Sequence, residues 1–193
     1  MRKLSRRCAA GRGREVTRAV TVELGGVAPP RYRLELPLSA DWRVVDPKYP
    51  DEDSDGVRSA NATAIAEMNL IRAAEALDSD FAAVLALPIT DSNGSILTIL
   101  IASVVGLTIP ISDIPEPDHP AFQFHVVDGV EVTPGRNASY GVVTYPVWSE
   151  DGQRVCLLTF SSPNLPYRAL LAEGFRAIAA SARLERVPAS PPA

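Results

Sequence analysis

Two turn signals constrain the fold of this 193-residue chain more than any other feature. The tetrapeptide Asp-Ser-Asn-Gly at 91–94 lies between two apolar runs of strand length, and Asn-Gly is strongly favoured in tight hairpins. The tetrapeptide Ser-Glu-Asp-Gly at 149–152 separates two further apolar runs in the same way. Short turns between successive strands require antiparallel pairing, so the sequence predicts a largely antiparallel sheet.

Hydrophobic periodicity divides the chain into strands and two helices. Apolar residues at spacings of three and four predict helices at 60–77 and 164–184, the second with Asn164 as N-cap and Pro166 in its first turn. Alternation of apolar and polar residues, or a short apolar run, predicts strands at 31–36, 42–45, 81–87, 95–105, 122–132, 140–147 and 154–160.

The element order β-β-α-β-β-β-β-β-α predicts an α+β fold. We expect a single-domain α/β/α sandwich, in which a largely antiparallel sheet of six to seven strands is covered by two helices. The sequence contains no internal repeat, so one domain is expected to span 31–186. A disordered basic tail is expected at 1–30, and a Pro-rich tail at 187–193.

Charge is distributed unevenly along the chain. The net charge is −4, but residues 1–18 hold 7 basic residues and 1 acidic residue, which leaves −10 for the rest. An acidic body disfavours nucleic-acid recognition, whereas the basic segment can attract phosphates or another anionic surface. The alternatives for that segment are an extension without a partner and a translation start at Val16 or Val20.

No segment has the features of a secretory signal or of a membrane-spanning helix. The longest apolar stretch runs from Ile96 to Ile109, whereas a bilayer-spanning helix needs about 20 residues. Cys8 is close to the N-terminus and Cys156 lies in a predicted strand, so we do not expect a structural disulfide between them. These features predict a cytoplasmic protein with no membrane span.

Two segments carry a resemblance to a known family. LELPLSADWRV at 34–44 and RVCLLTFSSPNLPYRALLAEGFRAIAASARLE at 154–185 resemble the PsbP-like α/β/α sandwich superfamily, and the closing segment is similar to small actinobacterial proteins of unknown function. Those proteins accompany specialised secretion or toxin systems, and known superfamily members mostly bind other proteins. The resemblance therefore implies a protein-binding domain, an accessory or chaperone-like partner of such a system. It implies no catalytic residue.

An acidic loop matches half of a calcium-binding pattern. Residues 51–56 read Asp-Glu-Asp-Ser-Asp-Gly, the first half of an EF-hand loop. The eighth position is Arg58 instead of an apolar residue, and the twelfth is Ala62 instead of the bidentate Glu. A solvated acidic loop before a helix N-terminus is the main interpretation, because the helix dipole favours acidic residues there. A Ca²⁺-dependent binding module remains an alternative.

The two histidines are the basis of the one alternative function that is enzymatic. His119 is next to Asp118, and a neighbouring carboxylate can orient a histidine as a general base, whereas His125 lies between Phe124 and Val126 in a predicted strand. The sequence has no G-x-S-x-G, P-loop, Cys-x-x-Cys or His-Glu-x-x-His motif. We therefore predict that the protein is not an enzyme and that it binds no cofactor and no metal. The alternative is a hydrolase that uses a histidine and an adjacent carboxylate.

Three aromatic residues are the candidates for a protein interface. Tyr145 and Trp148 flank Pro146 and Val147, and Tyr167 follows Pro166. Aromatic side chains anchor many protein interfaces, although Tyr145 and Trp148 also fit the end of a strand at the rim of a sandwich. Together with the resemblance, these residues predict a non-enzymatic domain that binds an unidentified protein partner.

Overall fold

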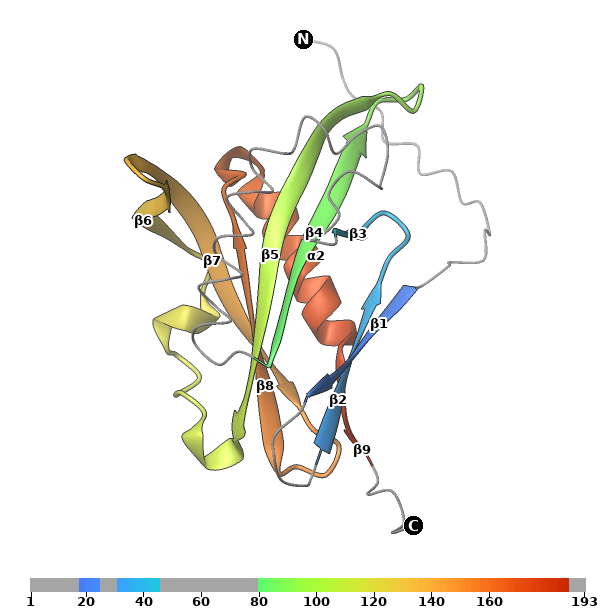
Figure 1. The fold of residues 1–193 in the computed structure, drawn as a ribbon, viewed down its shortest axis with the longest axis vertical. Helices are drawn as coiled ribbons and strands as arrows, with labels where there is room; N and C mark the ends of the chain where they lie inside the picture. Colours follow the sequence, from blue (N-terminus) through green and yellow to red (C-terminus); the bar gives the residue numbers. More distant parts are fainter. Residues whose placement is uncertain (1–17, 25–30, 46–79, 188–193) are drawn as a thin grey trace.

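The computed structural model describes residues 18–24, 31–45 and 80–187 (Figure 1). Within these ranges the chain forms one α-helix, α2 Arg168–Ser181, and the short 3₁₀ helices η2 Ile111–Asp113, η3 Pro120–Phe122 and η4 Leu165–Tyr167. The strands are β1 Arg18–Leu24, β2 Arg31–Leu38, β3 Arg43–Val45, β4 Phe81–Thr90, β5 Ile96–Pro110, β6 His125–Thr133, β7 Arg136–Trp148, β8 Arg154–Ser162 and β9 Arg183–Val187.

The strands form two antiparallel sheets. One has three strands in the order β1-β2-β9, and the other has six in the order β3-β4-β5-β8-β7-β6. The sheets meet where Ser149, directly after β7, forms a parallel bridge with Leu184 of β9. The α+β class and the largely antiparallel pairing expected from the sequence are therefore confirmed.

Both predicted turns are present, and their residues explain why. Gly94 has φ 82° and Gly152 has φ 65°, in the left-handed region that favours glycine. The Asp91 side chain accepts hydrogen bonds from the backbone N–H groups of Asn93 and Ser95, at 2.8 and 2.9 Å. Local chemistry thus defines the β4–β5 hairpin.

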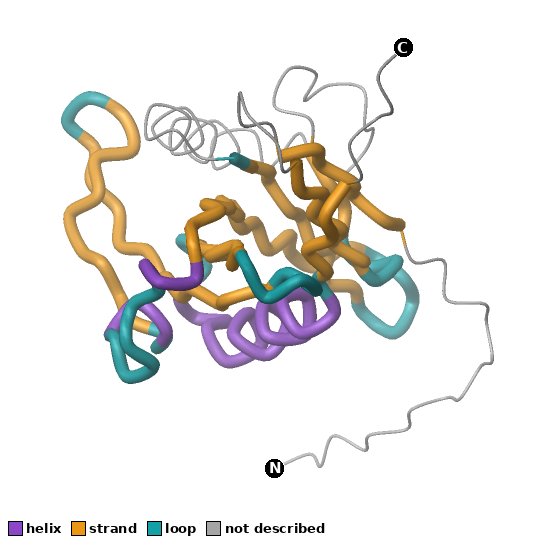
Figure 2. The backbone as a smooth tube through the Cα atoms, turned by 90° about the horizontal axis from the view of Figure 1, so that it is seen from below, coloured by secondary structure: helices purple, strands orange, loops and turns teal. Residues whose placement is uncertain are grey.

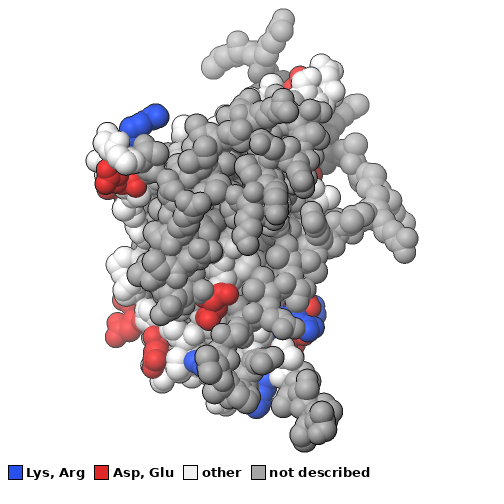
Figure 3. All heavy atoms as spheres, viewed as in Figure 1, with Lys and Arg blue, Asp and Glu red and all other residues white. Residues whose placement is uncertain are grey.

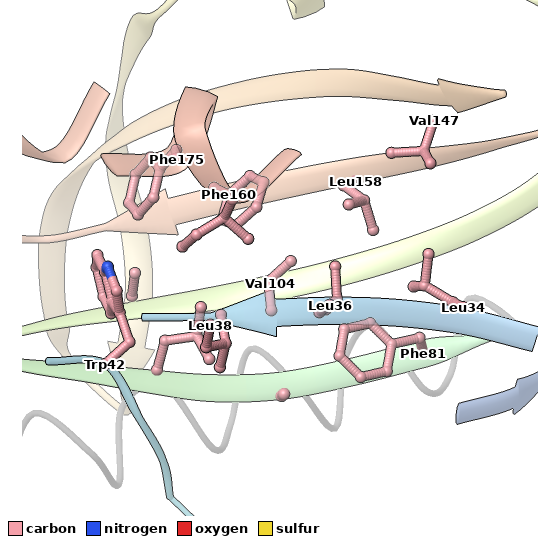
Figure 4. Packing of buried hydrophobic residues seen from close by; sticks show 14 of the residues in the cluster. Leu34, Leu36, Leu38, Trp42, Phe81, Val104, Val147, Leu158, Phe160 and Phe175 are labelled. Carbon is pink, nitrogen blue, oxygen red and sulfur yellow. The ribbon is translucent and has the colours of Figure 1, made fainter. Parts of the chain in front are cut away.

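The main core lies between the six-stranded sheet, α2 and the three-stranded sheet. Helix α2 contacts both β7 and β2, so it joins the two sheets on this inner face. Every second residue of β2 is buried there, and Phe175 of α2 stacks on Phe160 of β8 with ring centroids 4.8 Å apart (Figure 4). In Figure 2, α2 lies along one side of the strands, and the β6–β7 hairpin extends beyond the core.

The prediction of one sheet covered by two helices was wrong. The inner face is covered by α2 together with a second, three-stranded sheet, and the described residues contain one α-helix. The structure also places β1 within 1–30, where a disordered tail was expected. The helix predicted at 60–77 lies outside the described residues, as does the acidic loop at 51–56.

The helix predicted at 164–184 is three elements, η4, α2 and β9. Ala182 adopts an extended conformation, which ends α2 and starts β9 at the next residue. Asn164 does not cap the helix with its side chain. Its Oδ1 accepts hydrogen bonds from the backbone N–H of Ile101, at 2.9 Å, and from the hydroxyl of Ser162, at 3.2 Å, and so it ties this connection to β5.

Strand β4 continues through Pro88, where the sequence suggested that it stops. Strand β3 pairs with residues 84–86 of β4, so among the described residues Pro88 has no neighbour on that side of β4. Proline is tolerated at such an edge, because its missing N–H is not needed for pairing with a second neighbour. No helix among the described residues has the length and apolar character needed to cross a membrane.

Candidate functional site

The three aromatic residues predicted as an interface do not form one surface. Tyr145 lies on the inner face, edge-on to Phe160 at 6.0 Å, and its hydroxyl is 3.5 Å from the carbonyl oxygen of Ala172. Trp148 is three positions further along β7, so its side chain points to the opposite face, where it is 52% exposed. Tyr167, 41% exposed, precedes α2. Only Trp148 and Tyr167 are thus accessible, at separate places.

The two histidines have local roles. His119 Nδ1 accepts a hydrogen bond from the backbone N–H of Ala121 at 3.2 Å, at the start of η3. His125 Nδ1 lies 2.9 Å from the carbonyl oxygen of Gln123. Neither ring is paired with a carboxylate in the described part of the chain, and no group of three His, Cys, Asp or Glu residues gathers there as a metal site.

An open, largely apolar groove runs along one side of α2, and we call it the α2 groove. It has a volume of about 530 Å³, within the range of roughly 300–1,000 Å³ that is usual for binding pockets. One wall is a stripe of α2 and the other is the end of β2 with the turn into β3. Its lining residues are Pro37, Ser39, Asp41, Trp42, Leu87, Leu170, Glu173, Gly174, Ala177, Ile178 and Ser181.

Gly174 determines the shape of the α2 groove. A Cβ atom at this position would lie 3.2 Å from Cζ2 of Trp42, so the glycine allows the indole to pack directly against the helix. Trp42 also contacts Phe175, with ring centroids 6.3 Å apart, and is only 8% exposed. The indole therefore forms a fixed wall, whereas Leu170, 43% exposed, forms the accessible apolar edge.

The α2 groove carries negative charge. Asp41 and Glu173 are the ionisable residues among its described lining residues. Within the described ranges, neither carboxylate has a hydrogen-bond or ion-pair partner. The Ser181 hydroxyl donates to the carbonyl oxygens of Ala177 and Ile178, so it is already used within the helix. The described residues of the groove offer apolar contact and two exposed negative charges, and they include no nucleophile paired with a base.

A second cavity of about 540 Å³ lies where the two sheets meet, and we call it the junction cavity. Its centre is Asp151, which accepts hydrogen bonds from the Tyr32 hydroxyl at 2.9 Å and the Ser149 hydroxyl at 2.7 Å. Arg186 of β9 has a guanidinium nitrogen 3.9 Å from the same carboxylate. Because Tyr32 belongs to β2 and Asp151 to the β7–β8 turn, this network links the two sheets.

The network shifts the titration of both acids. The hydrogen bond from Ser149, followed by those from the Gln153 backbone and Tyr32, holds the pKa of Asp151 below its ordinary value. Burial, followed by the hydrogen bond to Asp151, raises the pKa of Tyr32. Asp151 is thus held as a carboxylate and Tyr32 as a neutral phenol.

Cys156 has no catalytic character. It is fully buried on the inner face, and burial raises the pKa of its thiol to about 12. The thiolate is the nucleophilic form, so this side chain serves as a small hydrophobic residue.

The α2 groove was not anticipated from the sequence. One signal was available: Gly174 interrupts an Ala- and Leu-rich helical segment, and a glycine inside a helix often marks a close packing contact. Its contact partner, Trp42, is too distant in sequence to be inferred from spacing. The distribution of charge does not indicate a binding site either. On the face drawn in Figure 3, the described acidic and basic side chains form small, separate groups.

Comparison of the chain with known protein families, with curated proteins and with solved structures finds no match. The residues and geometry of the α2 groove and of the junction cavity therefore carry the functional reasoning.

Proposed function

We propose that this chain is a non-enzymatic protein-binding domain, and that its α2 groove receives a segment of the partner protein. The observation that carries the proposal is an accessible apolar groove with two carboxylates, Asp41 and Glu173, that have no partner in the described ranges. A partner segment that fits has an apolar side chain to lie between Trp42 and Leu170 and a Lys or Arg to meet a carboxylate.

The position of the groove on regular elements supports this proposal. One wall is a 14-residue helix and the other is held by Trp42 against that helix, so the site is largely preformed. A preformed site loses little conformational entropy on binding, which favours affinity. The resemblance to the PsbP-like superfamily extends the proposal to a cytoplasmic accessory or chaperone-like role in a bacterial secretion or toxin system.

No observation favours a second function. A hydrolase would need His119 or His125 in a concave site, and neither lines the α2 groove or the junction cavity. The acidic loop proposed for Ca²⁺ lies outside the described residues.

Selection from a library of displayed 12-residue peptides tests the proposal. We expect enrichment of peptides that combine an aromatic or aliphatic residue with Arg or Lys. The Trp148→Phe variant leaves Trp42 as the only tryptophan, so its fluorescence reports directly on the groove when a selected peptide is added.

Two matched variants show whether those peptides use the groove. Ala177 and Ala180 are both exposed on α2, but only Ala177 lines the groove. Ala177→Arg should weaken binding by more than tenfold, whereas Ala180→Arg should leave it unchanged. Binding that survives Ala177→Arg, or enriched peptides without a basic residue, would contradict the proposal.

A further inference from the structure

We infer that the α2 groove also docks the chain's own basic N-terminal segment, residues 1–17, which there competes with the partner segment. The docking itself rests on the register of β1, the charge of the groove and the composition of the segment. The competition rests in addition on the proposed function.

The register of β1 brings the N-terminal segment to the groove. Arg18, the first residue of β1, pairs with Leu38, the last residue of β2. The two neighbours of Leu38, Pro37 and Ser39, both line the α2 groove. The chain therefore enters β1 at Arg18, beside the groove, so the segment that precedes Arg18 is tethered at the edge of the site.

The length of the segment matches the site. The groove stripe runs along α2 from Leu170 to Ser181, or about 16 Å at roughly 1.5 Å per residue. An extended chain covers about 3.3–3.6 Å per residue, so five or six residues reach from one end of the stripe to the other. The segment has enough residues to cross the groove more than once.

The charge and composition of the segment complement the groove. Residues 1–17 hold six basic residues and one acidic residue, together with the apolar side chains of Leu4 and Val16. The described lining of the groove has two exposed carboxylates, those of Asp41 and Glu173, and no basic side chain. Basic and apolar side chains together are what we propose the groove selects in a partner.

The covalent connection makes weak binding sufficient. A segment joined to its site by a short flexible linker has an effective concentration on the order of 1 mM. A groove that binds such a sequence with a dissociation constant of about 0.1 mM would therefore be occupied for about nine-tenths of the time. A partner segment has to displace the N-terminal segment before it can bind.

Cysteine cross-linking in the full chain tests the docking. Cys8 lies within the segment, and the buried thiol of Cys156 does not compete for oxidation. In the Ala177→Cys variant, mild oxidation should form an intramolecular disulfide between Cys8 and the new cysteine. The additional changes Asp41→Asn and Glu173→Gln should slow this reaction at least fivefold, because they remove the attraction but leave the tether.

Glu150→Gln and Glu185→Gln are the matched control, because they remove the same charge outside the groove and should not change the rate. Equal rates with and without Asp41 and Glu173 would overturn the docking. Replacement of Arg2, Arg6 and Arg7 by Gln should raise the affinity for an added groove-binding peptide, and unchanged affinity would overturn the competition. A charge-dependent cross-link with no peptide binding would refute the proposed function alone.

Discussion

The α2 groove and the junction cavity have nearly the same volume, about 530 and 540 Å³, but they treat charge in opposite ways. In the junction cavity, the carboxylate of Asp151 is surrounded by the donors of Tyr32, Ser149 and Arg186. In the α2 groove, Asp41 and Glu173 have no partner in the described ranges. The hydrogen-bonded carboxylate of Asp151 belongs to a structural link between the two sheets, whereas the exposed carboxylates of Asp41 and Glu173 are accessible to a basic group of another molecule.

The same difference predicts that substitutions in the junction cavity change the stability of the fold, whereas substitutions of the groove carboxylates change binding. Loss of a hydrogen-bonded carboxylate leaves buried donors without acceptors, which destabilises a fold. Loss of an exposed, unpaired carboxylate leaves no such donors.

Phe175→Ala should have the largest effect, because it removes a ring on which the α2 groove depends. Phe175 stacks on Phe160 and contacts Trp42, so its loss leaves a cavity behind the groove wall. We expect a decrease of about 3–5 kcal/mol in the free energy of unfolding, measured by urea titration. Phe175→Leu, which retains part of the volume, should lose less. A decrease below about 1 kcal/mol for the alanine variant would show that the wall is not part of the core.

Asp151→Ala should destabilise the protein without changing the α2 groove. The substitution leaves the Tyr32 hydroxyl without its acceptor, whereas the Ser149 hydroxyl keeps the carbonyl oxygen of Arg154, so we expect a loss of about 1–3 kcal/mol in urea titration. Glu150→Ala, at an exposed position in the same turn, should change stability by less than about 0.5 kcal/mol. Weakened peptide binding in Asp151→Ala would show that the two cavities are coupled.

Acid should weaken the hydrogen-bond network at the junction cavity. The pKa of Asp151 is lowered in the folded state, so its carboxylate stabilises the fold above the unfolded pKa near 3.8, and this contribution is lost as the pH falls through the lower, folded pKa. The stability difference between the wild type and Asp151→Asn should therefore shrink below pH 4. A difference that is constant from pH 6 to pH 2 would mean that the carboxylate is not specifically stabilised.

Glu173→Gln should have the smallest effect, and on binding only. An exposed ion pair contributes about 0.2–1 kcal/mol, so the affinity for a basic peptide should fall by roughly threefold. The midpoint of thermal unfolding should stay within about 2 °C of the wild type. Raising the salt concentration should reduce the difference in affinity, because salt screens exposed charges. A salt-independent loss would point to a change of packing.

Local chemistry made one part of the fold predictable. The turns at 91–94 and 149–152 depend on Asn, Asp, Ser and Gly residues that act on their own backbone, so neighbouring residues were sufficient to identify them. The strands around these turns, and with them the antiparallel six-stranded sheet, followed from the same reasoning.

Distant pairing could not be predicted in this way. The five residues of β9 fit the end of a helix as well as a strand, because so short a segment does not separate a period of 2 from one of 3.6. Strand β1 alternates clearly, but the basic residues before it suggested a tail. The α2 groove depends on the contact of Trp42 with Gly174, which no local pattern contains.

The face of the sheet to which each strand residue points could not be predicted from the sequence either. Tyr145 and Trp148 are neighbours in sequence and were grouped as one surface, but strand geometry directs them to opposite faces. The buried face became apparent only once the positions of α2 and β2 were known.

The pairing of β2 with β9 also bears on synthesis of the chain by the ribosome. Strand β2 emerges early, but Leu34 faces Leu184 across the sheet, close to the end of the described residues. At roughly 5–20 residues per second, about eight to thirty seconds pass between the two. During that time the apolar face formed by Leu34, Leu36 and Leu38 lacks both α2 and β9. This fold is therefore exposed to aggregation on the ribosome for longer than one in which neighbouring segments complete the core.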